Sequence, residues 1–360
     1  MANSLIDKII KNSPTKHASI LSESVLFTDK DVIPTPLPVL NIAFSGRLNG
    51  GMLSGLTILA GQSKSFKTLL GLFCVKAYLD KYPEAVCVLY DSEGGITPEY
   101  LKNNGIDPTR VVHIPIEHLE MLKFDMVKTL KTLERADKVI MLIDSIGNTA
   151  SLKELEDAEN EKSVAEMQRA KSMKALFRMI TPSLIAKDVP CICIAHTYQT
   201  MELYSKAVIS GGTGIIYSAT QAFIITKAQD KVKEELAGWK FTINIEKSRH
   251  VREKAKLPFI VHYDGGILKW SGLLDIALDA GAVIKPKNGW YQRVDLDTGE
   301  ILDGSFRERD TLTNDSFWEP IIKGEAFNKY IESRYSLSSD MKLNEEDSVN
   351  DTIDSLEEDE

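Results

Sequence analysis

The sequence predicts an α/β fold built on a mostly parallel, twisted sheet. Seven runs of nearly continuous apolar residues suit strands buried on both faces, and helical spacing of apolar residues appears between several of them. The segment 61–68, GQSKSFKT, lies between the first run and a helical pattern. A strand, a short loop ending in Lys-Thr and a helix are the parts of a phosphate-binding loop, or P-loop.

The first 30 residues predict a small helical arm. Leu5, Ile6 and Ile9 have the spacing of an amphipathic helix, and residues 19–27 form a partly alternating apolar segment. Residues 31–38 contain three alternating prolines, which favour an extended connector. Because apolar residues of the arm need a partner surface, on the same core or on a neighbouring subunit, we expect residues 1–27 to mediate oligomerisation.

Residues 31–270 are predicted to form the core. Its helices are predicted at 68–81, 118–136 and 164–187. The later strands have no helical pattern between them, so we expect them to extend the sheet as antiparallel members. The predicted strands are Leu56–Ala60, Val86–Asp91, Val139–Asp144, Cys191–Ala195, Ala222–Thr226, Phe241–Glu246 and Phe259–Tyr263.

Residues 271–335 are predicted to form a small α+β domain, because the pattern changes after Trp270. The predicted elements are a helix at Leu273–Ala280, a polar hairpin at 287–291 and a helical segment near 317–334. Residues 336–360 are predicted to be a disordered acidic tail.

The acidic tail accounts for the net charge of the chain. The whole chain carries −9, and residues 340–360 hold ten acidic groups against Lys342 alone, which is also −9. Residues 1–339 are therefore neutral overall, and the acidity of the chain does not exclude a nucleic-acid partner. The tail has two open interpretations: a solubilising segment, or a regulatory one that competes with phosphates for a basic groove.

The cysteine pattern predicts buried thiols in a reducing compartment. Cys191 and Cys193 lie two apart in a predicted strand, so both point to one face, which favours a packed core over a metal site or disulfide. No apolar run approaches the ~20 residues that a bilayer crossing needs, and the N-terminus lacks a secretory pattern. We therefore expect a cytoplasmic protein with no membrane partner.

The P-loop segment departs from its motif at one position, because Phe66 stands where glycine is expected. We expect a negative φ at Phe66, since a positive φ would cost roughly 1–2 kcal/mol. Lys67 would bridge the phosphates and the Thr68 hydroxyl would bind Mg²⁺. The alternative is an ordinary strand-to-helix turn. The predicted phosphate-binding residues are Gly61, Gln62, Ser63, Lys64, Ser65, Phe66, Lys67 and Thr68.

Two acidic side chains follow predicted strands that should lie beside the P-loop. Asp144 ends an apolar strand, which is the arrangement that holds the water shell of Mg²⁺. Glu93 lies just beyond another strand, where it could polarise a water that attacks the terminal phosphate. Either residue alone could be a solvated carboxylate at a strand end. Together beside a P-loop they predict a nucleotide hydrolase.

In its P-loop and its two strand-end acidic residues, the chain resembles the bacterial RecA recombinases, and most closely the UvsX recombinases of T-even-type phages. The resemblance covers about residues 1–335, and the Phe66 variant looks like the UvsX form. It implies a RecA-like ATPase core with ATP and Mg²⁺ as cofactors. The closest local matches are Gly61–Thr68, Tyr90–Tyr100, Leu142–Asn148, Gly211–Gly214 and Lys285–Tyr291.

The resemblance also implies roles for individual residues. Glu93 corresponds to the general base and Tyr100 to the aromatic residue that stacks on adenine, whereas Thr97 replaces an acidic residue of RecA. His196 stands where RecA has the glutamine that senses the γ-phosphate, although a lone histidine is more often a structural hydrogen-bond donor. Lys247 and Arg249 align with the basic pair that reaches the phosphates of the neighbouring subunit.

Two segments after nucleotide-facing strands look like DNA-contacting loops, although each could be an ordinary surface loop. The first, at 148–163, is polar and acidic and leads into a basic helix, and the second spans 197–214. Glycines before a helix can present backbone N–H groups to a phosphate. The predicted DNA-binding residues are Arg169, Lys174, Lys206, Gly211 and Gly212.

The sequence therefore predicts a DNA-dependent ATPase that forms helical filaments on single-stranded DNA and catalyses homologous pairing and strand exchange. Such a protein would act in recombination, repair and recombination-dependent replication. Its expected partners are single- and double-stranded DNA, copies of itself, a recombination mediator, a single-strand-binding protein and a helicase, in the host cytoplasm if the chain is of phage origin. The alternatives are a hexameric RecA-fold helicase and a recombinase-like accessory protein that binds ATP without appreciable hydrolysis.

Overall fold

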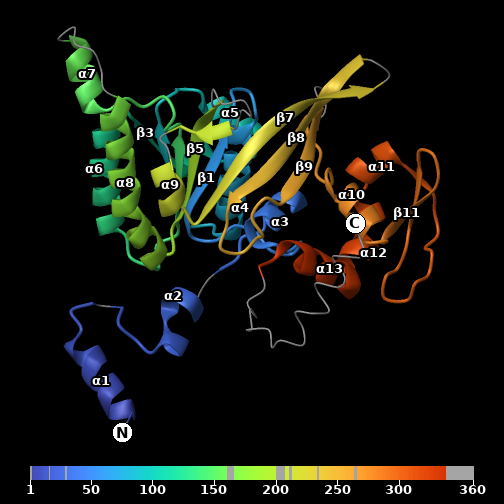
Figure 1. The fold of residues 1–360 in the computed structure, drawn as a ribbon, viewed down its shortest axis with the longest axis horizontal. Coiled ribbons are helices and arrows are strands. Elements are labelled where there is room, and N and C mark those ends of the chain that lie inside the picture. The colour runs from blue at the N-terminus through green and yellow to red at the C-terminus, as the bar shows by residue number, and fades with distance from the viewer. Residues whose placement is uncertain are drawn as a thin grey trace, which may run out of the picture.

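The computed structural model describes residues 2–15, 17–28, 31–159, 166–199, 207–210, 213–232, 235–262 and 266–337. Within these residues, ten strands form one twisted sheet in the order β10-β9-β8-β7-β1-β5-β4-β2-β3, with β6 paired to β5 (Figure 1). The strands β3, β2, β4, β5, β1 and β7 run parallel, which confirms the predicted α/β fold with a mostly parallel sheet.

The seven predicted strands are all present, but β7 continues to Val232, β8 begins at Glu235, and the predicted last residue Tyr263 lies outside the described residues. The strands of the large sheet are β1 Gly55–Gly61, β2 Val86–Asp91, β3 Val111–Pro115, β4 Val139–Asp144, β5 Pro190–Gln199, β6 Ala207–Ile209, β7 Gln221–Val232, β8 Glu235–Lys247, β9 Lys256–His262 and β10 Gly266–Ile267. The sequence did not predict β3, because this edge strand exposes Val112 and His113 and lacks a continuous apolar run.

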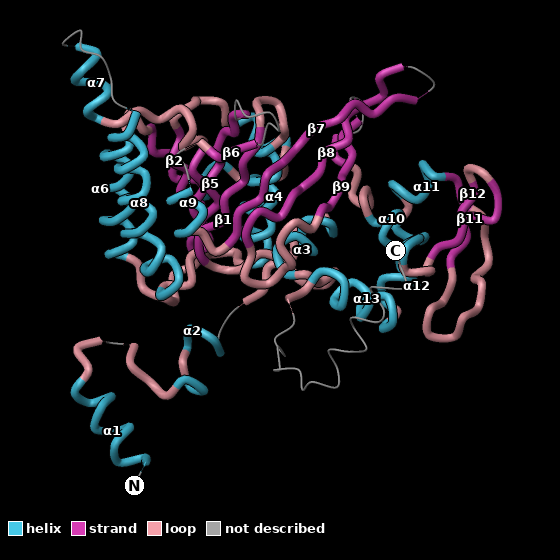
Figure 2. The backbone as a smooth tube through the Cα atoms, viewed as in Figure 1, coloured by secondary structure: helices cyan, strands magenta, loops and turns pink. Residues whose placement is uncertain are grey.

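The expected antiparallel pairing of the later strands holds between β7 and β8, β8 and β9, and β9 and β10, but it is wrong where β7 joins the sheet, because β7 runs parallel to β1. The short helix α9, Thr213–Ser218, precedes β7, which pairs parallel to β1. Figure 2 shows that β7 and β8 extend beyond the neighbouring strands as a long hairpin. This hairpin carries two side chains to the functional cleft described below.

Helices cover both faces of the sheet. The helices of the arm and core are α1 Ala2–Asn12, α2 Val25–Thr28, α3 Pro38–Ser45, α4 Lys67–Lys81, α5 Pro98–Asn103, α6 Leu119–Thr132, α7 Leu152–Glu159, α8 Glu166–Ala186 and α9. The three predicted core helices correspond to α4, α6 and α8. The pattern did not predict α3, because seven of its eight residues are buried and it has no polar face. A polar loop was expected at 148–163, but α7 occupies part of it.

Alternate residues of each strand enter two different cores. Leu59 of β1 packs with α3 and α4 on one face, whereas Ile58 packs with α6 and α8 on the other. The two-residue period of the strands produces this division. Cys191 and Cys193 lie together in the second core, and all four cysteines are buried and free, as predicted.

The N-terminal arm projects from the sheet (Figure 1). Leu5 and Ile9 on α1 are 59% and 61% exposed, which leaves an apolar stripe on this helix. The apolar segment predicted at 19–27 forms a 3-10 turn at Leu21–Glu23 followed by α2. Arg135 Nη2 donates to the Val25 carbonyl oxygen at 2.6 Å and so connects α2 to the core.

The C-terminal region contains a second sheet and four helices among the described residues. The elements are α10 Leu273–Asp279, β11 Val283–Lys287, β12 Trp290–Arg293, β13 Phe306–Arg307, α11 Glu308–Thr313, α12 Asp315–Lys323 and α13 Glu325–Tyr335. The hairpin predicted at 287–291 joins β11 and β12. The helical segment predicted near 317–334 is two helices, because Gly324 is extended between them. Trp318 stacks on Trp270 at 5.8 Å and ties this region to the core.

No helix in the described part of the chain is both long and apolar enough to cross a membrane. The acidic tail predicted at 336–360 falls mostly outside the described residues, which end at Leu337.

Candidate nucleotide-binding site

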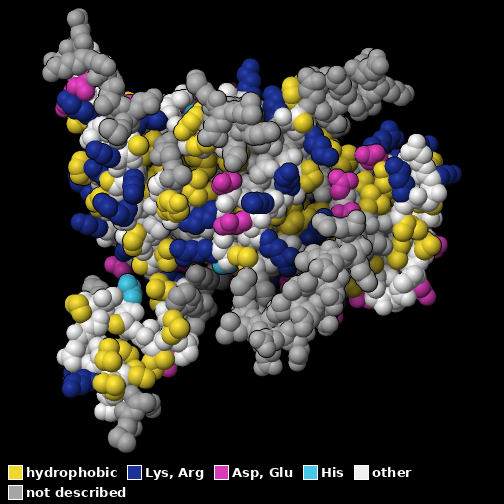
Figure 3. All heavy atoms as spheres, in the orientation of Figure 1, with side chains coloured by type: hydrophobic (Ala, Val, Ile, Leu, Met, Phe, Trp, Pro, Cys, Tyr) yellow, Lys and Arg dark blue, Asp and Glu magenta, His cyan; other side chains and the backbone are white. Residues whose placement is uncertain are grey.

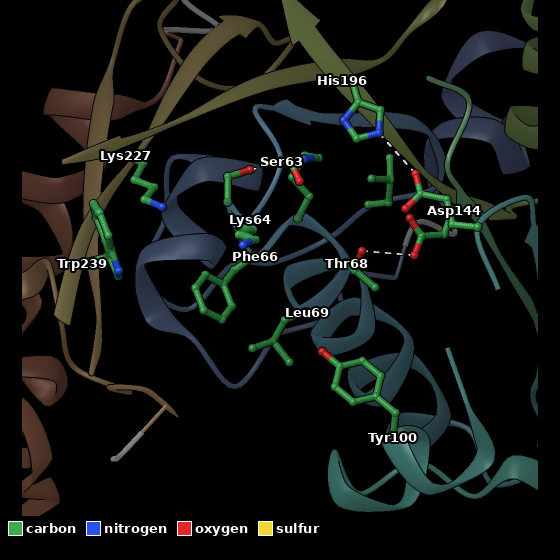
Figure 4. A pocket seen from close by; sticks show the side chains of 14 residues that line it. Ser63, Lys64, Phe66, Thr68, Leu69, Tyr100, Asp144, His196, Lys227 and Trp239 are labelled. Atoms are coloured by element: carbon green, nitrogen blue, oxygen red, sulfur yellow. Dashed lines mark hydrogen bonds and ion pairs between the residues drawn. The ribbon is translucent and has the colours of Figure 1, made fainter. Parts of the chain in front are cut away.

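A cleft of about 670 Å³ opens where the parallel strands β1, β2, β4 and β5 end (Figure 4). This is the edge at which open α/β sheets bind ligands, and the volume is that of a small-molecule site. The side chains that line it include Ser63, Lys64, Ser65, Phe66, Lys67, Thr68, Glu93, Tyr100, Asp144, His196, Lys227 and Trp239. Residues predicted from separate parts of the sequence therefore meet in one place.

The P-loop connects β1 to α4 as the sequence predicts. Gly61 is required at the end of β1, because a Cβ atom there would lie 2.7 Å from both the Ile225 carbonyl oxygen and Ser65 Oγ. Lys67 Nζ donates to the Gln62 carbonyl oxygen at 2.7 Å and contacts Ser65 Oγ at 3.3 Å. Burial lowers the pKa of Lys67. Its ammonium therefore lies inside the loop, where phosphate oxygens could replace these acceptors.

The expected negative φ at Phe66 is wrong. Phe66 has φ 59° and ψ 22°, the left-handed conformation that the glycine of the motif would adopt easily. Its ring contacts Phe241 of β8 edge to face, with the centroids 5.3 Å apart. Such a pair contributes about 0.5–1.5 kcal/mol beyond its buried area, which is comparable to the cost of roughly 1–2 kcal/mol for the strained backbone. Packing against β8 thus offsets a strain that the local sequence disfavours.

We expect Phe66→Gly to be more stable than Phe66→Ala by about 1 kcal/mol. Both changes remove the contact with Phe241, but only glycine also relieves the left-handed strain. Inside a helix the alanine variant would instead be the more stable of the two. Chemical denaturation of the two variants measures the difference. A more stable alanine variant would show that residue 66 does not hold a positive φ.

Asp144 is the residue best placed to bind a metal ion. Its Oδ2 accepts a hydrogen bond from Thr68 Oγ1 at 3.1 Å, whereas its buried Oδ1 has no hydrogen-bond partner among the described residues. Hydroxyl and carboxylate oxygens are the ligands that Mg²⁺ prefers, and it keeps waters and phosphates as further ligands. The unpaired oxygen therefore fits a Mg²⁺ site. No cluster of three or more His, Cys, Asp or Glu occurs in the described ranges, so a cage made of protein ligands alone is not seen there.

Burial, together with the negative charges of the nearby Glu93 and Asp91, raises the pKa of Asp144 from 3.8 to about 6. Because the folded-state pKa lies above the unfolded one, this group stabilises the fold fully below pH 4, and the contribution is lost as the pH rises to about 6. Without Mg²⁺ and nucleotide, we expect the wild type to lose about 2 kcal/mol more than Asp144→Asn between pH 4 and pH 7. Denaturant unfolding at both pH values tests this. Equal losses in the two proteins would contradict it.

Asp91 positions the backbone around Glu93, a role that the sequence analysis did not assign. Its Oδ1 accepts hydrogen bonds from the N–H groups of Glu93 and Gly94 at 2.9 and 2.7 Å. His113 Nε2 of β3 lies 3.0 Å from the other carboxylate oxygen. Asp91 ends a predicted strand just as Asp144 does, so its position was a usable signal. Because Asp91 is buried and already hydrogen-bonded, it does not line the cleft, whereas Glu93 and Asp144 do.

The cleft has aromatic residues on two sides. Figure 4 shows Tyr100 on one side and Lys227 with Trp239 on the other. Burial raises the pKa of Tyr100. Thr97 Oγ1 accepts a hydrogen bond from the backbone N–H of Tyr100, so Thr97 caps the N-terminus of α5. Lys227 Nζ lies 3.6 Å from the centre of the Trp239 ring. Both residues come from the β7–β8 hairpin, and neither was predicted, because no local motif marks them.

Lys247 and Arg249 do not line the cleft of their own protomer. Lys247 Nζ donates to the carbonyl oxygens of Ile216 and Tyr217 near the end of α9, at 2.8 and 2.9 Å. Burial and Arg249 lower the pKa of Lys247. Arg249 lines a different groove together with Arg47. The structure therefore separates this basic pair from Lys67.

The predicted DNA-binding residues fall into three groups. Arg169 is half-buried and donates to the carbonyl oxygens of Ile146, Gly147 and Thr149, so it braces the start of the first loop. Lys174 is exposed on α8, where Figure 3 shows Lys and Arg side chains gathered over α6 and α8. The remaining three, Lys206, Gly211 and Gly212, lie outside the described residues.

Comparison with known proteins decides what kind of protein carries this site. The chain is 51% identical over 339 residues to the "Recombination and repair protein" of Enterobacteria phage T4, which covers 93% of this chain and 86% of that protein. The chain belongs to the RecA family of strand-exchange recombinases. The family assignment favours the predicted recombinase over the helicase alternative.

More distant RecA relatives agree with this assignment. The recombinase is 26% identical to RecA of Tropheryma whipplei (strain Twist) over 283 residues, 77% of this chain and 62% of that protein. It is 28% identical to RecA of Chlorobaculum tepidum over 273 residues, 74% of this chain and 76% of that protein. Residues 270–331 match the model of the C-terminal domain of the phage T4 recombination and repair protein. RecA-family membership implies ATP binding, DNA binding and filament formation.

Proposed function

We propose that this recombinase hydrolyses ATP between adjacent protomers of a helical filament on single-stranded DNA, and that the nucleotide controls pairing and strand exchange. The observation that carries the proposal is that Lys67 lies in the cleft, whereas the other two candidate phosphate-binding cations do not. Lys67, Thr68, Glu93 and Asp144 meet in one cleft, whereas Lys247 and Arg249 lie elsewhere on the same protomer.

Within one protomer, the P-loop would hold the phosphates of ATP. Backbone N–H groups of the loop, the N-terminus of α4 and the Lys67 ammonium are suited to phosphate oxygens. Thr68 and Asp144 would hold Mg²⁺, which neutralises phosphate charge when bound. Tyr100 would stack on the adenine, and its half-buried ring lines the same cleft.

Glu93 would act as the general base. In this reaction a water oxygen attacks the γ-phosphorus, the bond to the β-phosphate oxygen breaks, and Glu93 accepts the proton of the water. His196 would sense the γ-phosphate, since its ring lines the cleft and its Nε2 lies 3.2 Å from Glu93 Oε1. Its position on β5, just before the second candidate DNA loop, supports a link between nucleotide state and DNA affinity.

The neighbouring protomer would supply Lys247 and Arg249 to the phosphates. Repeated head-to-tail contact that does not close produces a filament, and the exposed apolar stripe of α1 supports the arm as one side of that contact. The proposed domains are an N-terminal arm at residues 1–30, an ATPase core at 31–270, a C-terminal domain at 271–335 and an acidic tail at 336–360. A mediator, a single-strand-binding protein and a helicase remain proposed partners.

Electron microscopy of the full chain with Mg·ATP and single-stranded DNA, together with phosphate release, tests this function. We expect DNA-dependent hydrolysis and helical filaments. Closed rings would favour the helicase alternative. Binding of ATP without appreciable turnover would favour the accessory protein, which the presence of both Glu93 and Asp144 in one cleft disfavours.

A further inference from the structure

Three hydrogen-bond donors converge on one oxygen of Glu93. Its Oε1 accepts from Ser145 Oγ and from Asn148 Nδ2 at 3.1 Å, and it lies 3.2 Å from His196 Nε2, which donates when that nitrogen carries the ring proton. Ser145 follows β4, Asn148 begins the first candidate DNA loop, and His196 precedes the second. The starts of both loops therefore contact the same carboxylate oxygen.

The segment that carries Asn148 is held from two sides. On one side, Arg169 of α8 donates to the carbonyl oxygens of Ile146 and Thr149 at 3.2 and 2.9 Å. On the other side, the His196 ring lies so close that a Cβ atom on Gly147 would be 2.3 Å from its Cδ2. These contacts fix the backbone on either side of Asn148, and its amide is directed at Glu93.

The number of donors exceeds what this oxygen can accept well. A carboxylate has about four lone-pair sites shared by two oxygens, so three donors occupy both sites of Oε1. An oxygen in this arrangement has no site left for a proton from water, and the carboxylate is held in one orientation. Hydrogen bonds to a carboxylate stabilise its charged form, so loss of one donor would free a site on Oε1 and make Glu93 a stronger base at either oxygen.

We propose that Asn148 is a positioning residue that holds Glu93 in a resting orientation until DNA engages the loop. This inference rests on the proposed role of Glu93 as the general base. Ser145 is buried and His196 half-buried, whereas Asn148 is exposed, so Asn148 is the donor that DNA can reach. Asparagine amides commonly donate to backbone phosphates, so a DNA phosphate oxygen would compete with Glu93 for this donor. When the Asn148 amide turns from Glu93 to the phosphate, Glu93 is released, and DNA binding is thereby coupled to ATP hydrolysis.

The test compares ATP turnover with and without DNA in Asn148→Ala and Asn148→Asp. Without DNA, we expect kcat to rise about three- to tenfold in Asn148→Ala, which is the effect of one lost hydrogen bond. The Asp variant keeps the shape of asparagine, donates no hydrogen bond and repels Glu93, so its kcat should rise at least as much. KM for ATP should not change. A purely structural role would leave Asn148→Asp like the wild type without DNA.

The matched control is Asn288→Ala, because Asn288 is an exposed asparagine in the turn between β11 and β12 and lines neither the cleft nor the groove that contains Arg249. Its turnover without DNA should equal that of the wild type. The decisive control repeats Asn148→Ala in a Glu93→Gln background, where the gain should disappear. A gain that persists there would overturn the inference.

The outcomes separate this inference from the proposed function. If Glu93→Gln alone turns over ATP like the wild type, the assignment of the base fails. If Glu93→Gln is inactive but both Asn148 variants keep wild-type turnover without DNA, the base stands and the positioning role of Asn148 is wrong.

Discussion

Glu93→Gln should lower ATP turnover by about 10²- to 10⁴-fold, while ATP and DNA binding stay close to wild type. Glutamine has nearly the same shape and can still accept hydrogen bonds from Ser145 and Asn148, so the cleft should keep its geometry. The variant lacks only the carboxylate that accepts a proton from water. Phosphate release measures turnover, and fluorescence anisotropy of labelled DNA measures binding.

The control for this prediction is Glu117→Gln, which changes an exposed glutamate in the loop before α6 and outside the cleft. It should match the wild type in every assay. Turnover in Glu93→Gln that equals that of the control would remove Glu93 as the base. A loss of ATP binding in parallel with turnover would mean that Glu93 shapes the cleft instead.

Lys67→Ala and Lys247→Ala should each abolish hydrolysis alone, and a mixture of the two should recover it. If Lys247 acts on the neighbouring protomer, an intact P-loop meets an intact Lys247 at about a quarter of the junctions in an equal, random mixture. We therefore expect about a quarter of the wild-type rate from two inactive proteins. Steady-state phosphate release from mixed filaments, at constant total protein, measures the recovery.

The matched control is the double variant Lys67→Ala/Lys247→Ala mixed with either single variant. Neither mixture contains a complete junction, so both should stay inactive. Recovery in these controls would point to contamination or to a different site. No recovery in the mixture of single variants, with filaments still visible, would place both lysines in the same protomer's site. That result would conflict with the hydrogen bonds of Lys247 to α9, unless its side chain turns.

The sequence predicted the core elements well, because their signals are local. Apolar runs identified β1, β2, β4 and β5, and helical spacing identified α4, α6 and α8. The elements that it missed lack such signals. The edge strand β3 is half exposed, and α3 is buried on nearly all sides, so neither has the periodicity that a pattern can detect.

The candidate site was predicted in composition but not in geometry. The P-loop, Glu93 and Asp144 could be found because strand ends and motif spacing mark them. The conformation of Phe66 could not, because it depends on Phe241, a residue that packs against it from a distant strand. Trp239 and Lys227 also escaped prediction, since only the pairing of β7 with β8 brings them to the cleft.

Residue patterns were sufficient for the fold class, the P-loop and the acidic residues, since each depends on neighbours along the chain and on the two periods of helix and strand. The folded structure was needed to show that Asn148 and His196, 55 and 103 residues from Glu93, contact the same oxygen. It was also needed to show that Lys247, at the end of β8, hydrogen-bonds to α9 and does not line the cleft of its own protomer. Such contacts depend on how strands and helices pack, and packing joins residues whose separation along the chain carries no local signal.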